Sequence, residues 1–162
     1  MPVVEDLHAQ AEVRSALLAL NAESVIETSP LSPERFDWMI ACARIATFVP
    51  PADAFLIAFA HDDAFDGGHF LWFRARLPSF LYVDRIVVAA ASRGRGYGRL
   101  LYEDLFVRAR AAGIDRIVCE VNAVPPNPRS AAFHARLGFQ EIGTATLDGG
   151  AKTVRYLALD FA

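Results

Sequence analysis

The chain has 162 residues, of which 54% are hydrophobic, and a formal net charge of −3 at pH 7. This length and apolar content predict one domain over residues 1–162, and no low-complexity linker divides it. The basic residues form no extended face for a nucleic-acid backbone, which argues against nucleic acid as a partner. No apolar run reaches the roughly eighteen residues of a membrane span, and no secretion signal is seen, so we expect a cytoplasmic protein that does not enter membranes.

The cysteine and histidine content points to neither redox nor metal chemistry. The two cysteines, Cys42 and Cys119, each lie in an apolar segment, which predicts reduced thiols in the core rather than a disulfide or a nucleophile. The histidines and aspartates of residues 61–69 are irregularly spaced, unlike the ligands of a metal site. We therefore expect no metal.

The first part of the chain predicts a short strand, two helices and two strands. A helix is expected over residues 8–21, and the pair Ser32-Pro33 is typical of the cap and first position of a second helix. Apolar residues 45–49 and 54–60 predict strands joined by a tight connection.

A glycine-rich turn follows the apolar run Ile86-Val87-Val88 and leads directly into an amphipathic helix. Glycines at positions 94, 96 and 98 let the backbone adopt positive φ and turn successive amides inward, where the helix also places its positive dipole end. This arrangement is typical of a cradle for phosphate or pyrophosphate.

The residue types in this turn distinguish three classes of ligand that carry phosphate. A nucleoside triphosphate loop requires Lys-Ser/Thr after the last glycine, but Arg99-Leu100 follows Gly98. The dinucleotide pattern puts Arg99 where the third glycine belongs, although Glu120 stands close to the expected acidic position. An NAD(P)-binding oxidoreductase therefore stays as the alternative.

The third comparison is a resemblance to the acyl-coenzyme A loop of the GNAT acetyltransferases, written Arg/Gln-x-x-Gly-x-Gly/Ala. Arg93, Gly96 and Gly98 match it without a gap. Downstream, a helix of about four turns and a strand over residues 115–121 predict a right-handed parallel crossover. Residues 127–139 then resemble the family's second motif, Asn-x-x-Ala/Ser-x-x-aromatic-Tyr-x-x-x-Gly-Phe.

The resemblance implies the α/β (α+β) fold of the GNAT acyl-coenzyme A N-acyltransferases. That fold has a mixed, mostly antiparallel sheet of about six to seven strands, helices on both faces and a central parallel pair that splays apart. A closing hairpin of residues 140–147 and 153–161 around Asp148-Gly149-Gly150 agrees with it. The implied ligands are acetyl-coenzyme A and a primary amine of a small molecule, amino acid or peptide; a sensor that binds acyl-coenzyme A without catalysis is a further alternative.

The same resemblance assigns the coenzyme-binding residues. They lie in the strand before the glycine loop, in the loop itself and in the second motif. They are Ile86, Val87, Val88, Arg93, Gly94, Arg95, Gly96, Tyr97, Gly98, Arg99, Asn127, Ser130, Phe133 and His134.

Three side chains are candidates for the chemistry of acyl transfer. Asp84 shares a strand face with Tyr82, Ile86 and Val88 by the period of two, which makes Asp84, and less strongly Tyr82, a candidate base or amine-binding residue. The alternative for Asp84 is a structural role, as a partner of Arg85 or a charge at the edge of the sheet. His134 stands where many relatives have the tyrosine that protonates the departing thiolate. An imidazolium is a stronger acid than a phenol, so His134 is a candidate for the proton donor; a histidine that packs near the coenzyme for shape is the other interpretation.

Residues 61–80 form a long connection that is dense in aromatic side chains. Such insertions often carry binding surfaces, and an acceptor pocket beside Asp84 is one interpretation. A hydrophobic cluster under the loop, or a contact in a homodimer, are the others. Arg74 and Arg76 are either partners for an acceptor carboxylate or exposed loop residues. The candidate acceptor-binding residues are Phe70, Trp72, Phe73 and Phe80.

Overall fold

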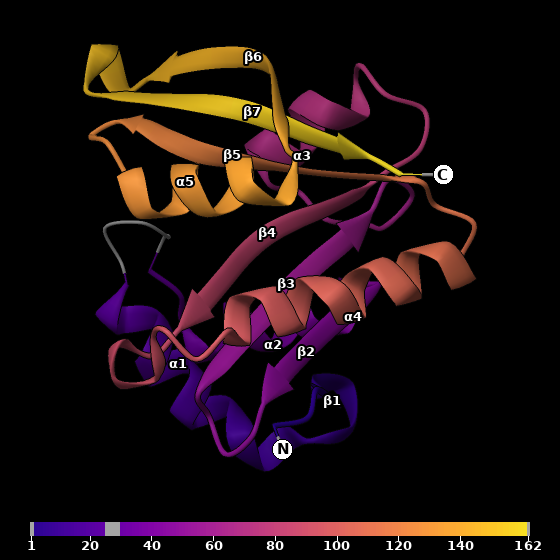
Figure 1. Cartoon of the computed structure of the whole chain (residues 1–162), viewed down its shortest axis with the longest axis vertical. Coiled ribbons are helices and arrows are strands. Elements are labelled where there is room, and N and C mark those ends of the chain that lie inside the picture. Colours follow the sequence, from indigo (N-terminus) through magenta and orange to yellow (C-terminus); the bar gives the residue numbers. More distant parts are fainter. Residues whose placement is uncertain (1, 25–29, 162) are drawn as a thin grey trace.

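The computed structural model describes residues 2–24 and 30–161, and within them the strands form one seven-stranded sheet of order β1-β2-β3-β4-β5-β7-β6 (Figure 1). Neighbouring strands are antiparallel except β4 and β5, which are parallel. This confirms the mixed sheet expected from the sequence. The strands are β1 (Glu5–Asp6), β2 (Ile45–Val49), β3 (Ala54–Ala60), β4 (Leu81–Val88), β5 (Arg116–Val124), β6 (Gln140–Leu147) and β7 (Lys152–Asp160).

Helices cover both faces of the sheet, and a separate cluster of buried hydrophobic residues lies between each face and its helices. Leu17, Met39 and Phe70 belong to the cluster beneath the first three helices, and Leu101 and Phe139 belong to the cluster on the α4 side. The two layers therefore bury alternate residues of the central strands. The helices are α1 (Arg14–Glu23), α2 (Pro33–Cys42) and α3 (Gly68–Arg74) on one face, and α4 (Tyr97–Ala111) and α5 (Pro128–Leu137) on the other.

Local capping chemistry explains why two helices start where the sequence indicates. The Ser32 hydroxyl accepts a hydrogen bond from the amide of Arg35, and Pro33 occupies the first turn. The Asn127 side chain accepts likewise from the amide of Ser130. Both predicted helices are confirmed, as is the closing hairpin of β6 and β7.

The helix expected over residues 8–21 is only partly correct. Two short 3₁₀ turns, Leu7–Ala9 and Ala11–Val13, precede α1. Tertiary contacts override the helical pattern there: Leu7 is fully buried, and a ring nitrogen of His8 lies 3.0 Å from the carbonyl oxygen of Ala43.

The connection of residues 61–80 contains a helix, α3, where the sequence indicated only a long connection. Phe70 and Phe73 are both fully buried and face the sheet one turn apart, which makes α3 a structural layer of the fold. In the described part of the chain, none of the helices is long and apolar enough to cross a membrane.

Candidate active site

The parallel strands β4 and β5 pair over a very short length. Their register joins Leu81 to Ile117 and Tyr82 to Val118, after which the two strands diverge (Figure 1). The splayed pair expected from the sequence is confirmed. Its opening leads into a cavity of about 710 Å³.

This cavity gathers the sequence-predicted residues from β4, the glycine loop and α5. Tyr82, Asp84 and His134 all line it. Of the predicted coenzyme-binding residues, Arg95 alone stands outside its wall, exposed at the tip of the loop. The residues of this set that line the cavity are Ile86, Val87, Val88, Arg93, Gly94, Gly96, Tyr97, Gly98, Arg99, Asn127, Ser130, Phe133 and His134.

The glycine loop has the backbone of an anion cradle. Gly94 and Gly96 have φ of +81° and +78°, in the left-handed region that favours glycine. Gly96 caps α4 without a side-chain hydrogen bond, so the first amides of the helix are available to an external acceptor. A Cβ atom at either position would meet open space, so the loop lies open to a ligand. These residues fit a phosphate group.

Gly98 has a different role from the two loop glycines. A Cβ atom at this position would lie 3.2 Å from the ring of Phe133. The absence of a side chain therefore lets α4 and α5 approach closely beside the cavity, which places Phe133 in its wall.

A β-bulge in β4 changes the direction of its side chains. Ala58 of β3 pairs with Val83 and Ile57 pairs with Arg85, so Asp84 is the extra residue. The expectation that Asp84, Tyr82, Ile86 and Val88 share one face is therefore wrong. Tyr82 packs in the cluster beneath α1 to α3, whereas Ile86 and Val88 pack on the α4 side. The inserted residue reverses the alternation between them.

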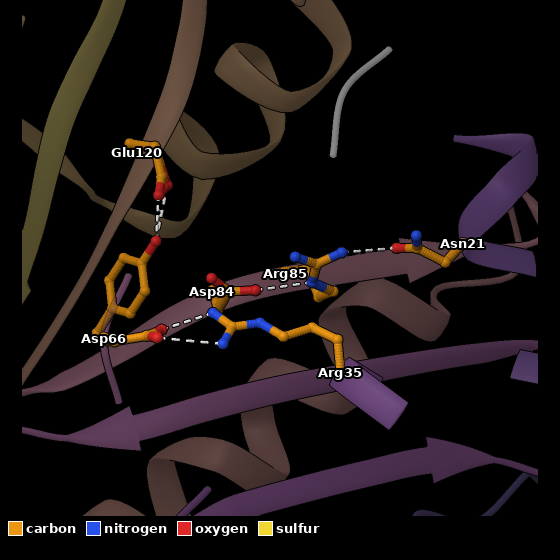
Figure 2. A network of polar contacts seen from close by, with 7 residues as sticks. Asn21, Arg35, Asp66, Asp84, Arg85 and Glu120 are labelled. Atoms are coloured by element: carbon orange, nitrogen blue, oxygen red, sulfur yellow. Dashed lines mark hydrogen bonds and ion pairs between the residues drawn. The ribbon is translucent and has the colours of Figure 1, made fainter. Parts of the chain in front are cut away.

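Glu120, on β5, faces Tyr82 across the gap between the diverging strands. The Tyr82 hydroxyl donates a hydrogen bond to the Glu120 carboxylate (Figure 2). Burial, followed by the negative charge of Asp84, raises the pKa of Glu120 to about 8, although the Tyr82 hydrogen bond acts in the opposite direction. Burial also raises the pKa of Tyr82, so its phenol stays protonated. The pair thus places one titrating carboxyl inside the cavity.

Two arginine–aspartate pairs lie below Glu120 in the view of Figure 2, Arg85 with Asp84 and Arg35 with Asp66. Arg85 Nε donates to Asp84 at 2.7 Å, and a terminal nitrogen donates to Asn21 Oδ1 at 2.9 Å. Arg35 of α2 makes a two-point contact with Asp66, at 2.6 and 3.2 Å. Hydrogen bonds thus orient both guanidinium groups toward the aspartate carboxylates with which they pair.

His134 is buried, and both its ring nitrogens have partners. Nε2 lies 2.7 Å from the Tyr102 hydroxyl, and Nδ1 lies 2.8 Å from the backbone oxygen of Ser130. Burial lowers the pKa of His134, so the ring is neutral at pH 7. Donation to a carbonyl oxygen assigns the ring proton to Nδ1, which leaves Nε2 to accept from Tyr102.

Most of the aromatic side chains predicted to bind an acceptor belong to the core. Phe70, Phe73 and Phe80 are fully buried, and none of them is among the residues that line the cavity. Trp72 stacks on Tyr156 at 4.0 Å between ring centroids, and Arg76 Cζ lies over the Trp72 ring, 4.0 Å from its centroid. Of the interpretations offered by the sequence, these contacts match the hydrophobic cluster.

Three further residues of the site were not singled out as catalytic or acceptor-binding from the sequence: Glu120, His69 and Arg35. Glu120 is the one acid of β5, and the sequence indicated it only as the ribose contact of a dinucleotide. His69 Nδ1 lies 2.9 Å from the Tyr156 hydroxyl, and burial lowers the pKa of this histidine. Its sequence context of aspartates and glycines gave no indication of that contact. No group of three metal-binding side chains occurs among residues 2–24 and 30–161.

The comparisons with known proteins agree with this geometry. The model of the acetyltransferase (GNAT) family matches residues 18–139. The phosphinothricin N-acetyltransferase of Streptomyces coelicolor is 41% identical over 59 residues, a match that covers 36% of this chain and 33% of the relative. The chain thus aligns with about a third of that relative's length.

Solved structures share the fold across the whole chain. An N-acetyltransferase from Staphylococcus aureus Mu50 has a TM-score of 0.71 at 20% identity and covers 99% of this chain and 98% of its own. YncA from Salmonella typhimurium, a putative acetyltransferase solved with acetyl-coenzyme A, has a TM-score of 0.71 at 16% identity, covering 99% and 94%. The glycine loop, the splayed strands and the family match over residues 18–139 together show that the chain belongs to the acetyltransferase (GNAT) family.

Proposed function

We propose that the protein is an N-acetyltransferase that moves an acetyl group from acetyl-coenzyme A to a primary amine by direct attack in a ternary complex. The observation that carries this proposal is the single cavity that connects the glycine loop to the Tyr82–Glu120 pair. One end fits a pyrophosphate, and the other end holds a titrating carboxyl close to where β4 and β5 separate. The coenzyme supplies an activated thioester.

The loop residues would hold the donor by its phosphates. The amides at the start of α4 bind oxyanions through hydrogen bonds and the helix dipole. Arg93 and Arg95 are exposed beside them and add positive charge. The pantetheine arm would lie in the gap between β4 and β5, against the open edge of β4.

The main chain of β4 offers an oxyanion donor there. The amide of Ala89 donates to Asp53 on the β3 side at 2.8 Å. Because successive amides of a strand point in opposite directions, the amide of Val88 points into the gap and that of Val87 points toward β3. We assign Val88 to the oxyanion that develops on the thioester carbonyl, since preorganised donors stabilise such charge strongly.

Glu120 is the base of the proposed reaction. A pKa of about 8 lies nearer to that of an alkylammonium group, about 10.4, than an unperturbed carboxyl does, which favours proton transfer. Glu120 accepts the proton of the attacking amine as the C–N bond forms and the C–S bond breaks. Asp84 faces the same space and would orient the ammonium group before it is deprotonated.

His134 is assigned to the wall of the coenzyme site in this proposal. Glu120 loses its proton near pH 8, while His134 is protonated only below its ordinary pKa of about 6.5. Few molecules would therefore hold Glu120 deprotonated and His134 protonated at the same pH. Since its nitrogens are also engaged by Tyr102 and Ser130, we propose that solvent protonates the departing thiolate.

The nicotinamide alternative finds less support. Dinucleotide-binding folds carry the glycine loop on a mostly parallel sheet, whereas this sheet has one parallel pair. Glu120, the acid that the alternative needs for a ribose, is bonded to Tyr82.

The experiment that tests the proposal combines binding with turnover. Calorimetry should show binding of acetyl-coenzyme A but not of NAD, and thiol release should occur across a panel of amines. Binding without thiol release from any amine would favour the sensor, and absence of binding would refute the proposal.

A further inference from the structure

A second cavity, of about 250 Å³, opens beside the first on the side of α2 and α3. The two cavities share His69, Tyr82, Asp84 and Arg85, so the second one reaches the region of the proposed base. Its volume lies below the roughly 300–1,000 Å³ typical of sites for drug-sized ligands. The second cavity therefore suits a compact molecule.

The wall of the second cavity carries two guanidinium groups of different origin. Arg35 projects from α2 and Arg85 from β4, and both face the space beside Asp84 (Figure 2). The side chain of Arg85 is only 5% exposed. Burial of a guanidinium is unfavourable unless an opposite charge and hydrogen bonds compensate it. Here the Asp84 carboxylate supplies the charge, and Asn21 accepts a further hydrogen bond.

Apolar side chains complete the wall. Leu31, Met39 and Phe65 line the second cavity and not the first, which contains Glu120. The wall of the second cavity thus combines the Asp84 carboxylate, the guanidinium groups of Arg35 and Arg85, which we call the basic corner, and an apolar side. A molecule with an ammonium group, an anionic group and a short carbon skeleton is complementary to all three.

We infer that the second cavity is the acceptor subsite and that it takes a small amine bearing a carboxylate, such as a free α-amino acid. The inference rests on the proposed function and names its acceptor class. The ammonium group lies toward Asp84 and Glu120, and the carboxylate lies toward Arg35 and Arg85. The amino end of a peptide lacks that carboxylate, so a peptide does not satisfy the basic corner.

The arginines of this proposed subsite differ from those that the sequence indicated as carboxylate partners. Arg74 and Arg76 were candidate carboxylate partners, but Arg76 donates to the Trp72 backbone oxygen at 2.9 Å and covers the indole ring. Neither of them is among the residues that line the two cavities.

The first arm of the test changes the acceptor rather than the protein. Thiol release from acetyl-coenzyme A is measured with the free α-amino acids and with their α-carboxamides, which have the more reactive free amine. We expect the acid to exceed its amide in kcat/KM by about tenfold or more, mainly through KM, because charge-assisted hydrogen bonds to the carboxylate are lost in the amide. Equal use of acids and amides, or a preference for peptides, would overturn the inference.

The second arm changes the basic corner. Arg35→Gln should remove the preference for the acid over its amide, and Arg35→Lys should retain part of it. Arg44→Gln is the matched control, because Arg44 is also paired with an aspartate, Asp62, but does not line either cavity. An acid-to-amide ratio that persists in Arg35→Gln contradicts the proposed subsite.

A binding measurement separates this inference from the proposed function. Calorimetry follows the titration of amino acids into the protein saturated with coenzyme A. Binding that weakens in Arg35→Gln but not in Arg44→Gln supports the subsite even if acetyl transfer is absent. Absence of both binding and transfer across the amino acids refutes the subsite.

Discussion

The Tyr82 hydroxyl and the Glu120 carboxylate are joined by a hydrogen bond that spans the gap between β4 and β5. Replacing Glu120 by Gln keeps the shape of the side chain but removes the proposed proton acceptor. We expect kcat to fall by about 10²- to 10⁴-fold, with little change in the dissociation constant of acetyl-coenzyme A. Steady-state kinetics and calorimetry measure the two effects.

Controls for this prediction come from the neighbours of Glu120. Glu141→Gln, on exposed β6 and paired with Arg155, should leave kcat unchanged. The Tyr82 hydrogen bond lowers the pKa of Glu120 and the Asp84 charge raises it, so Tyr82→Phe should move the alkaline rise of the pH–rate profile upward and Asp84→Asn downward. A profile unmoved by both changes would remove Glu120 from its role.

The same carboxyl makes stability depend on pH. Its pKa is about 8 in the folded chain, against an ordinary value of 4.5, because of burial and Asp84. Between these values the folded chain retains a proton that the unfolded chain has lost, so the free energy of unfolding falls as pH rises, by at most about 5 kcal/mol. Chemical denaturation of wild type and Glu120→Gln should therefore converge at low pH and favour the variant near pH 8. Parallel curves would show that Glu120 has no raised pKa.

Gly96 and Gly113 provide a matched pair for the phosphate cradle. Both have positive φ, +78° and +73°, and both face open space where a Cβ atom would lie. Alanine at either position should cost roughly 1–2 kcal/mol of stability through backbone strain. Only Gly96→Ala should also weaken acetyl-coenzyme A binding, as measured by calorimetry. Equal affinity in both variants would exclude the loop as the phosphate site.

His134→Phe should mainly affect stability. It leaves the buried Tyr102 hydroxyl without its 2.7 Å partner, a loss of about 1–3 kcal/mol. Tyr102→Phe is the control, since it removes the same hydrogen bond but keeps the imidazole. We expect kcat to stay within about threefold in both variants if solvent supplies the proton. A fall of tenfold or more in His134→Phe alone would restore His134 as the acid.

Gly143→Ala should loosen α3 from the sheet. A Cβ atom there would lie 2.8 Å from the indole of Trp72, which stacks on Tyr156. We expect a loss of about 1–3 kcal/mol from overpacking, whereas alanine at the exposed neighbour Thr144 should change little. Thermal unfolding measures both, and equal melting temperatures would show that Trp72 is free to move.

Sequence motifs predicted the fold and one end of the site. The glycine turn, the capped helix after Asn127 and the hairpin strands all depend on local chemistry, which a sequence displays directly. The remaining features of the site depend on pairing between strands that are distant in the sequence. The bulge at Asp84 depends on the register between β3 and β4, and the residue type at position 84 does not predict a bulge.

The catalytic assignment failed to single out Glu120 for the same reason. Its importance comes from Tyr82, which is 38 residues away in the chain and meets it only because β4 and β5 are neighbours. The aromatic residues near Phe70 show the converse: a dense local pattern left a binding surface, a hydrophobic cluster and a dimer contact open, and α3 turns Phe70 and Phe73 into the core. Local composition does not say which face of an unforeseen helix is buried.

The brief pairing of β4 with β5, at Leu81–Ile117 and Tyr82–Val118, leaves the two halves of the sheet joined by a narrow seam. A donor molecule bound in that opening would contact both halves of the sheet and bridge them. Part of the resistance to unfolding would then come from the ligand, growing with its concentration as the bound state is filled. Under this arrangement, the concentration of the acyl donor would set both the free energy of unfolding and the rate of turnover.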